Sequence, residues 1–207
     1  MLIHWFAENL DEYFCEKVSA MPLGMVYADG RLPSKLEAPT IPPLAHRPNK
    51  AFCSHRIREG EQWEPRRKVT DYAQGDWSSI CTVVIDELPE IEFLGNVAKH
   101  RFVLCVEGGG LDPSPKAWQS ILYGAIPIIR QSPVADIYLD LPVVVVPEWT
   151  NEAITERKLL SWFEERKHFF DEVEPRKQVL FKLTREYWWQ KMMEPLRKIL
   201  ISQGVSL

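Results

Sequence analysis

Short runs of consecutive apolar residues recur through the middle of the chain, separated by segments of helical length. Because the apolar positions within each run are continuous rather than alternating, they are typical of parallel strands that are covered on both faces. The intervening segments 63–73, 88–99 and 116–123 are expected to be helices. This alternation predicts an α/β fold with a doubly wound, mostly parallel, Rossmann-like sheet. The five expected strands are residues 51–54, 81–85, 102–106, 126–129 and 143–146.

The two ends of the chain have different patterns. Short strands are expected at 2–6 and 18–21, followed by a proline-dense connector, 33–48, without regular structure. After Trp149 two helices are expected, one from Thr150 or Asn151 to about residue 170 and another from Glu174 to about residue 201. The predicted organisation is an irregular segment (1–49), a Rossmann-like domain (50–149) and a helical carboxy-terminal extension (150–207).

The last expected helix carries a concentration of large apolar side chains, 187–189 with Met192 and Met193. We expect these side chains to pack the helix onto the sheet domain. The alternative is that they form a surface for a partner protein.

Composition narrows the class of protein. With 45% hydrophobic and 26% charged residues the chain is in the ordinary globular range, and its net charge of -4 does not favour a nucleic-acid partner. The sequence has no apolar run of about 20 residues and no basic, then apolar, start, so we expect a cytoplasmic protein without a membrane span. The four cysteines form no C-x-x-C pair and are expected to be free, buried thiols rather than zinc ligands: Cys15, Cys53, Cys81 and Cys105.

The first candidate binding loop is basic and follows the first core strand. Ligands of open α/β sheets bind beyond the carboxyl ends of the strands, so a loop in this place is a candidate site. Arginine forks can hold phosphate oxygens, and a diphosphate would suit the loop. Residues 66–68, on the helix that follows, either join this site or form a solvated basic face. The expected phosphate-binding residues of the loop are Ser54, His55, Arg56 and Arg58.

The second candidate loop is rich in glycine and follows the third core strand. It runs from Glu107 through Gly108, Gly109 and Gly110 to Asp112. Adjacent glycines permit positive φ and let a ligand approach the backbone closely. The loop lacks the spacing of a dinucleotide fingerprint or of a phosphate-binding P-loop.

These loops belong to a linked series of motifs that resembles the exostosin-like glycosyltransferases. That family has a Gly-x-Gly-Leu-Asp loop, a Trp-Glu-Ala-Leu helix, a Gly-Cys-Ile-Pro-Ile-Val strand and a Leu-Pro-Val strand ending in Asp-Trp. The matching segments here are 101–112, 117–120, 123–129 and 141–149. Upstream, residues 8–11 and 17–24 are similar to the family's Asn-Leu-Asp and Ile-Pro-Leu-Gly segments.

The resemblance covers most of residues 8–149 and implies the donor-binding, carboxy-terminal half of a B-type (GT-B) glycosyltransferase. Such a domain binds a nucleotide-diphosphate sugar as substrate, with no metal and no other cofactor. Arg56 and Arg58 would face the diphosphate, and residues 108–112 would lie near the sugar or the phosphates.

Other positions match the family with changes. Gln119 is in the place of a glutamate expected to hold the ribose hydroxyls, and an amide lacks the charge-assisted strength of a carboxylate. Lys116 would replace a cation of the family's Thr-His-Arg segment, which this chain lacks, and Ser132 could offer a hydroxyl and a helix-start amide to phosphate. Asp112 and Glu107, with His55, are the candidates for a catalytic base.

The leading expectation is an inverting transfer of a sugar from a nucleotide-diphosphate donor to a glycan or other hydroxyl acceptor. Family enzymes carry the acceptor on an amino-terminal Rossmann domain, which 49 residues cannot build. A protein partner or a homo-oligomer is then expected to supply that half, or catalysis is lost. The alternatives are a non-catalytic nucleotide-sugar-binding module and a fucosyltransferase-like enzyme, since a strand, a Glu-Gly loop and a helix occur in that order there too.

Overall fold

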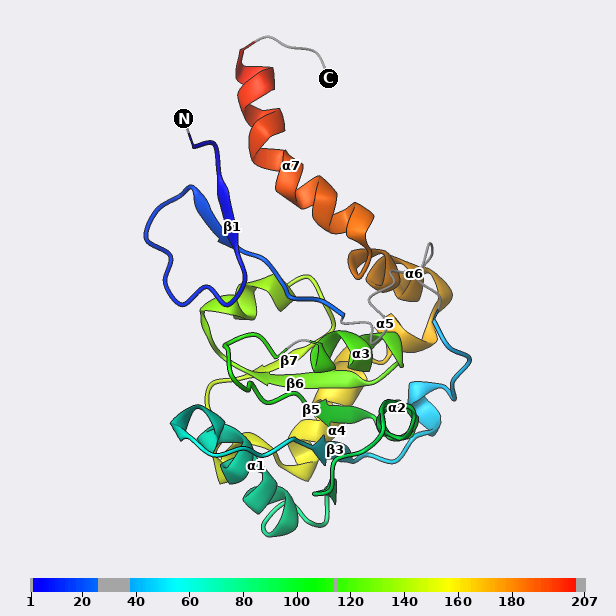
Figure 1. Cartoon of the computed structure of the whole chain (residues 1–207). Helices are drawn as coiled ribbons and strands as arrows, with labels where there is room; N and C mark the ends of the chain where they lie inside the picture. Colours follow the sequence, from blue (N-terminus) through cyan, green and yellow to red (C-terminus); the bar gives the residue numbers. More distant parts are fainter. Residues whose placement is uncertain (1, 26–37, 114, 204–207) are drawn as a thin grey trace.

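A five-stranded parallel sheet forms the centre of the computed structural model, which describes residues 2–25, 38–113 and 115–203 (Figure 1). The order of the strands in the sheet is β4-β3-β5-β6-β7. This confirms the predicted α/β class and the Rossmann-like parallel sheet. The strands are β3 (Ala51–Ser54), β4 (Cys81–Val84), β5 (Phe102–Leu104), β6 (Ile126–Arg130) and β7 (Val144–Val146).

Successive strand residues point to opposite faces of the sheet, and both faces are covered. Phe52, Val103 and Ile129 belong to one buried cluster, while Cys53 and Leu104 belong to the other. The continuous apolar runs follow from this, because each side chain along a strand enters one of two cores. The first face is covered by α2 (Glu90–Val97), α3 (Lys116–Leu122), η3 (Pro133–Tyr138) and α6 (Val173–Lys182). The second face is covered by α1 (Glu64–Gln74), which follows the short turn η2 (Glu61–Trp63), and by α4 (Glu156–Arg166).

Both long helices expected after Trp149 are interrupted. The first is divided into η4 (Asn151–Ala153), α4 and α5 (His168–Asp171), and the second into α6 and α7 (Arg185–Ser202). Thr155 and Thr184 cap α4 and α7, because their hydroxyl oxygens accept hydrogen bonds from Lys158 N and Tyr187 N. The prediction of two helices was therefore wrong in their number.

The amino-terminal segment forms a small sheet of its own. β1 (Trp5–Ala7) and β2 (Val18–Ala20) pair in parallel, close to the two strands that were expected there. In the connector, residues 33–37 lie outside the described residues, and the rest contains one short turn, η1 (Leu44–His46). The Asp171 carboxylate accepts hydrogen bonds from Leu44 N and Ala45 N, at 2.7 and 3.1 Å, and so ties η1 to α5.

The last helix, α7, projects away from the sheet and runs beside β1 (Figure 1). None of its residues is buried, and Trp189 is 59% exposed. The expected packing on the sheet domain is found for Trp188, whose ring meets that of Trp118 with 5.9 Å between centroids. Most of the apolar surface of α7 therefore lies outside the two cores.

Two further expectations concern the cysteines and the membrane. Cys53, Cys81 and Cys105 are free and buried, as expected, but Cys15 is exposed because it lies in the loop between β1 and β2. No helix of the described ranges has the length and apolar character needed to cross a bilayer.

Candidate functional site

The order of the strands places a switch point between β3 and β5. From β3 the chain adds β4 on one side, then returns across the sheet to place β5, β6 and β7 on the other. Loops that leave neighbouring strands toward opposite sides open a crevice between them, and ligands of open α/β sheets bind there. The two loops at this switch point are the basic loop that begins at His55 and the glycine loop that follows β5.

Arg66 joins these two loops. Its Nε donates to the Glu107 carbonyl oxygen and its Nη1 to the Arg56 carbonyl oxygen, each at 3.1 Å. The guanidinium lies over the ring of Trp63, 4.8 Å from the centroid, and burial lowers its pKa. A Cβ at Gly108 would lie 2.6 Å from Arg66 Nη2 and 2.8 Å from the Trp63 ring, so this glycine is needed for the approach. The two predicted loops therefore lie side by side.

A lysine and a histidine meet where β3 ends and the basic loop begins. Lys116, at the start of α3, donates to the Ser54 carbonyl oxygen and lies 2.8 Å from His55 Nδ1. Its ammonium also faces the Phe93 ring. Burial lowers the pKa of Lys116 to about 8, and burial, followed by the charges of Lys116 and Arg66, lowers the pKa of His55 well below its ordinary value. A cation and a neutral imidazole thus meet where β3 ends.

The far half of the glycine loop holds the amino-terminal segment. The Asp112 carboxylate accepts hydrogen bonds from Leu23 N, at 2.8 Å, and from the Tyr138 hydroxyl. Asp112 N donates to Asn9 Oδ1 at 3.0 Å, and a Cβ at Gly110 would clash with the Asn9 side chain. Asn9 has a φ of 51°, which asparagine tolerates better than most residues. The loop therefore fastens the β1–β2 sheet to the core.

The Glu107 side chain connects the ends of β5, β6 and β7. Its Oε1 pairs with Arg130 Nε at 2.5 Å, and its Oε2 accepts a hydrogen bond from Trp149 Nε1 at 3.3 Å. Arg130 ends β6, and Trp149 follows β7. Both carboxylates predicted to be catalytic, Glu107 and Asp112, are buried and hydrogen-bonded within the protein. Their catalytic role stays a prediction.

The remaining predicted residues surround the crevice without joining one cluster. The Arg56 guanidinium pairs with Glu87 at the surface, and that of Arg58 lies 5.4 Å from the centroid of the Trp63 ring. Gln119 Nε2 donates to Glu90 Oε1 on α2 at 3.4 Å. A Cβ at Gly109 would make only an ordinary contact with the Trp63 ring, and Ser132 precedes η3, where its carbonyl oxygen accepts from Ala135 N.

An open groove runs along the basic loop. It has a volume of about 500 Å³ and is lined by Ile57, Arg58, Glu59, Gly60 and Arg67. Arg67 donates to the Arg58 and Gly60 carbonyl oxygens, at 2.9 and 3.0 Å, and so fixes the curve of the loop. Among the residues with described positions, no group of three or more His, Cys, Asp or Glu side chains could hold a metal ion.

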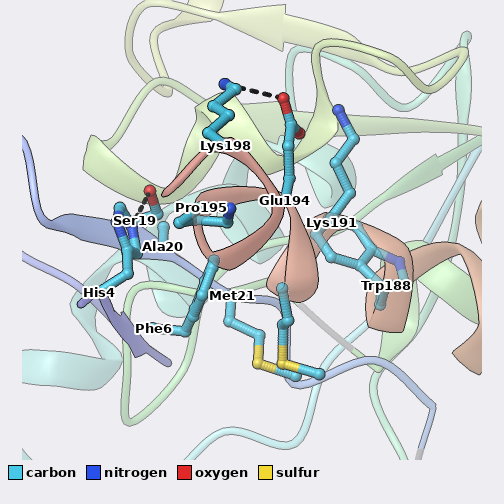
Figure 2. Close-up of a pocket in the computed structure, with 11 residues that line it drawn as sticks. His4, Phe6, Ser19, Ala20, Met21, Trp188, Lys191, Glu194, Pro195 and Lys198 are labelled. Atoms are coloured by element: carbon cyan, nitrogen blue, oxygen red, sulfur yellow. Dashed lines mark hydrogen bonds and ion pairs between the residues drawn. The ribbon is translucent and has the colours of Figure 1, made fainter. Parts of the chain in front are cut away.

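A separate pocket of about 260 Å³ lies between the β1–β2 sheet and α7 (Figure 2). Phe6, Met21 and Met192 supply apolar walls. Two pairs of its polar groups contact each other, since His4 Nε2 lies 2.9 Å from Ser19 Oγ and Lys198 pairs with Glu194 at 2.9 Å. Lys191, which also lines the pocket, pairs with Asp140 outside it. The small sheet and α7 meet along this pocket.

Sequence reasoning did not find the residues that hold the site together. Arg66 was one of three cations with two open interpretations, and Asn9, Arg130 and Trp149 were not candidates. Arg66 had one available signal, because the first turn of a helix that follows a strand faces the loop between them. No model of a known protein family and no characterised protein matches this chain. The exostosin resemblance stays a prediction.

Proposed function

We propose that this chain binds a nucleotide-diphosphate sugar in the crevice between the loops that follow β3 and β5, and transfers the sugar to a hydroxyl acceptor. The observation that carries the proposal is the bridge made by Arg66, which holds the basic loop against Gly108 at the switch point. Arginine side chains beside a glycine-rich loop at such a switch point suit a diphosphate. The motif series that resembles the exostosin-like enzymes supports the reaction class.

In this proposal the reaction is a displacement at the sugar carbon that inverts its configuration. Negative charge develops on the leaving diphosphate, and fixed positive groups at the crevice stabilise it in the transition state. Arg56 and Arg58 are the exposed cations available for this role. Arg66 shapes the crevice, because its Nε and Nη1 are already bound to the two loops.

A non-catalytic nucleotide-sugar-binding module is the second candidate, and one observation favours it. A general base must reach the proton of the attacking hydroxyl, yet the carboxylates of Glu107 and Asp112 already accept hydrogen bonds from protein groups. The crevice would then hold a donor that another chain uses.

Thermal unfolding of the chain with UDP, GDP and their sugars tests binding. A ligand that prefers the folded state stabilises it by about 2.7 kcal/mol at a concentration of 100 Kd. We expect one nucleotide series to raise Tm, and we expect Arg56→Ala to reduce that rise. Because Arg56 is exposed and its ion pair is with the exposed Glu87, its removal should change the Tm of the unliganded protein little.

Lys177→Ala is the matched control, since Lys177 also makes an exposed ion pair but lies on α6. The rise in Tm that a ligand produces in Lys177→Ala should equal the rise in the wild type. If no nucleotide or nucleotide sugar raises Tm, the proposed function is wrong. If nucleotide sugars bind but a radiolabelled donor yields no transfer to any glycan or hydroxyl acceptor, the binding module is the correct alternative.

A further inference from the structure

One buried polar atom at the crevice is unexplained by the contacts described so far. His55 is only 4% exposed, and its Nε2 has no hydrogen-bond partner among the residues that the structure describes. Leaving a buried donor or acceptor unpaired destabilises the folded state. Such an atom calls for a partner that the described residues do not supply.

The contact with Lys116 determines whether His55 Nε2 is a hydrogen-bond donor or an acceptor. A protonated lysine only donates hydrogen bonds, so His55 Nδ1, at 2.8 Å from Lys116 Nζ, must accept. In a neutral imidazole the proton then lies on Nε2. The unpaired atom is therefore an N–H donor, and its ligand must offer an acceptor.

The surrounding charges restrict that acceptor further. The groups whose charges act on His55 are the cations of Lys116 and Arg66. The ammonium of Lys116 is held by the Ser54 carbonyl oxygen and the Phe93 ring, neither of which carries a full negative charge. The nearby carboxylate of Glu107 is neutralised by Arg130. An anionic oxygen next to His55 would gain from both cations.

We propose that His55 Nε2–H donates a hydrogen bond to a phosphoryl oxygen bound at the switch point, and that Lys116 acts as a positioning residue that fixes this tautomer. This deepens and rests on the proposed function, because it assigns the innermost contact of the same crevice. Lys116, which the sequence suggests as a direct ligand contact, acts instead through His55. The arrangement uses a neutral donor beside a buried cation, so the phosphate is oriented as well as attracted.

Inorganic pyrophosphate, titrated into the full chain by calorimetry, is the probe for this contact. His55→Asn keeps an acceptor near the place of Nδ1 but lacks a donor at Nε2, whereas the side-chain amide of His55→Gln reaches the place of Nε2. A hydrogen bond to a charged group contributes about 1.5 to 3 kcal/mol, so we expect His55→Asn to weaken pyrophosphate binding roughly 10- to 100-fold. His55→Gln should restore most of the affinity.

Nitrogen-15 spectra of the wild type give a second readout that needs no variant. They should show His55 protonated at Nε2 alone, with an Nε2 resonance that shifts when pyrophosphate is added. In Lys116→Met the two tautomers should mix. A wild-type spectrum with the proton on Nδ1, or an Nε2 resonance indifferent to pyrophosphate, overturns the proposal.

The outcomes separate this inference from the proposed function. If pyrophosphate binds through His55 but no nucleotide sugar binds, the phosphate site is correct and the proposed function is wrong. If nucleotide sugars bind equally well to wild type and His55→Asn, the function is supported and the His55 contact is refuted. If neither pyrophosphate nor any nucleotide binds, both proposals are wrong.

Discussion

Replacing glycine with alanine should have opposite effects on stability at Gly124, which follows α3, and at Gly95, which lies within α2. Gly124 has a φ of 72°, and a Cβ there would clash with Ile41 and lie 2.8 Å from Arg47 Nη2. We expect Gly124→Ala to lower the free energy of unfolding by about 2 to 3 kcal/mol, since a left-handed residue with a clash is penalised twice. Gly95 lies within α2 with nothing within 4 Å of its Cβ position, so Gly95→Ala should stabilise by about 0.5 to 1 kcal/mol. Urea denaturation measures both, and equal effects of the two substitutions would contradict the argument.

At the glycine loop, sequence reasoning predicted a close approach to the backbone but not the groups that make it. The close approach that Gly108 and Gly110 permit is made by the protein's own side chains, Arg66 and Asn9. A sequence shows that a glycine allows close contact, but it does not show which group approaches. Asn9 comes from a segment about 100 positions earlier in the chain, and that contact exists only once the fold brings the segments together.

Between elements, a buried carboxylate links the ends of β5, β6 and β7. Removing the Glu107 side chain would leave the largely buried guanidinium of Arg130, whose side chain is 25% exposed, without its close partner. It would also leave Trp149 Nε1 without its acceptor. We expect Glu107→Ala to lower the free energy of unfolding by about 2 to 4 kcal/mol, measured by urea denaturation.

Glu148 provides the control, because it pairs with the same arginine from the surface. Its side chain is 65% exposed and lies 3.4 Å from Arg130 Nη1. Glu148→Ala should change stability by less than about 0.5 kcal/mol. If Glu107→Ala and Glu148→Ala lowered the free energy of unfolding by similar amounts, burial would not determine how strongly each ion pair with Arg130 stabilises the fold.

The strands of the sheet could be predicted from the sequence, whereas the breaks in the helices after β7 could not. A parallel strand buried on both faces is apolar at nearly every position, so β3 and β6, whose last residues are Ser54 and Arg130, are evident as apolar runs. The breaks between η4 and α4 and between α6 and α7 depend on Thr155 and Thr184, which cap the following helices. Threonine occurs in many helix interiors and loops, and only the geometry of its hydroxyl shows that a helix begins there.

For the whole molecule, the sequence predicts that the parallel sheet has a switch point, but it does not show between which strands that point lies. Strand and helix alternation implies a parallel sheet, but the spatial order of the strands is set by which crossover packs best. The order β4-β3-β5-β6-β7 makes β3 and β5 neighbours, and this alone brings the basic loop and the glycine loop together. The bridge by Arg66 then follows from the placement of α1 directly after the basic loop.

Stability of the whole fold should fall in mild acid, because two buried histidines must remain neutral. Burial is the main cause that lowers the pKa of His55 and of His100, which stacks on Phe52 and bonds Asn96 O through Nδ1. Below the ordinary histidine pKa of 6.5 the unfolded chain binds these protons and the folded chain does not, so protons favour unfolding. The stability is fully present above pH 6.5 and decreases toward the lower folded pKa values.

Urea denaturation at pH 7, 6 and 5 should therefore show a free energy of unfolding that decreases by up to about 1.4 kcal/mol per pH unit for each histidine. In His55→Gln the decrease should be shallower, because one of the two linked protons is gone. A His55→Gln profile that runs parallel to the wild type would show that folding does not lower the pKa of His55, which removes its share of the acid sensitivity argued here.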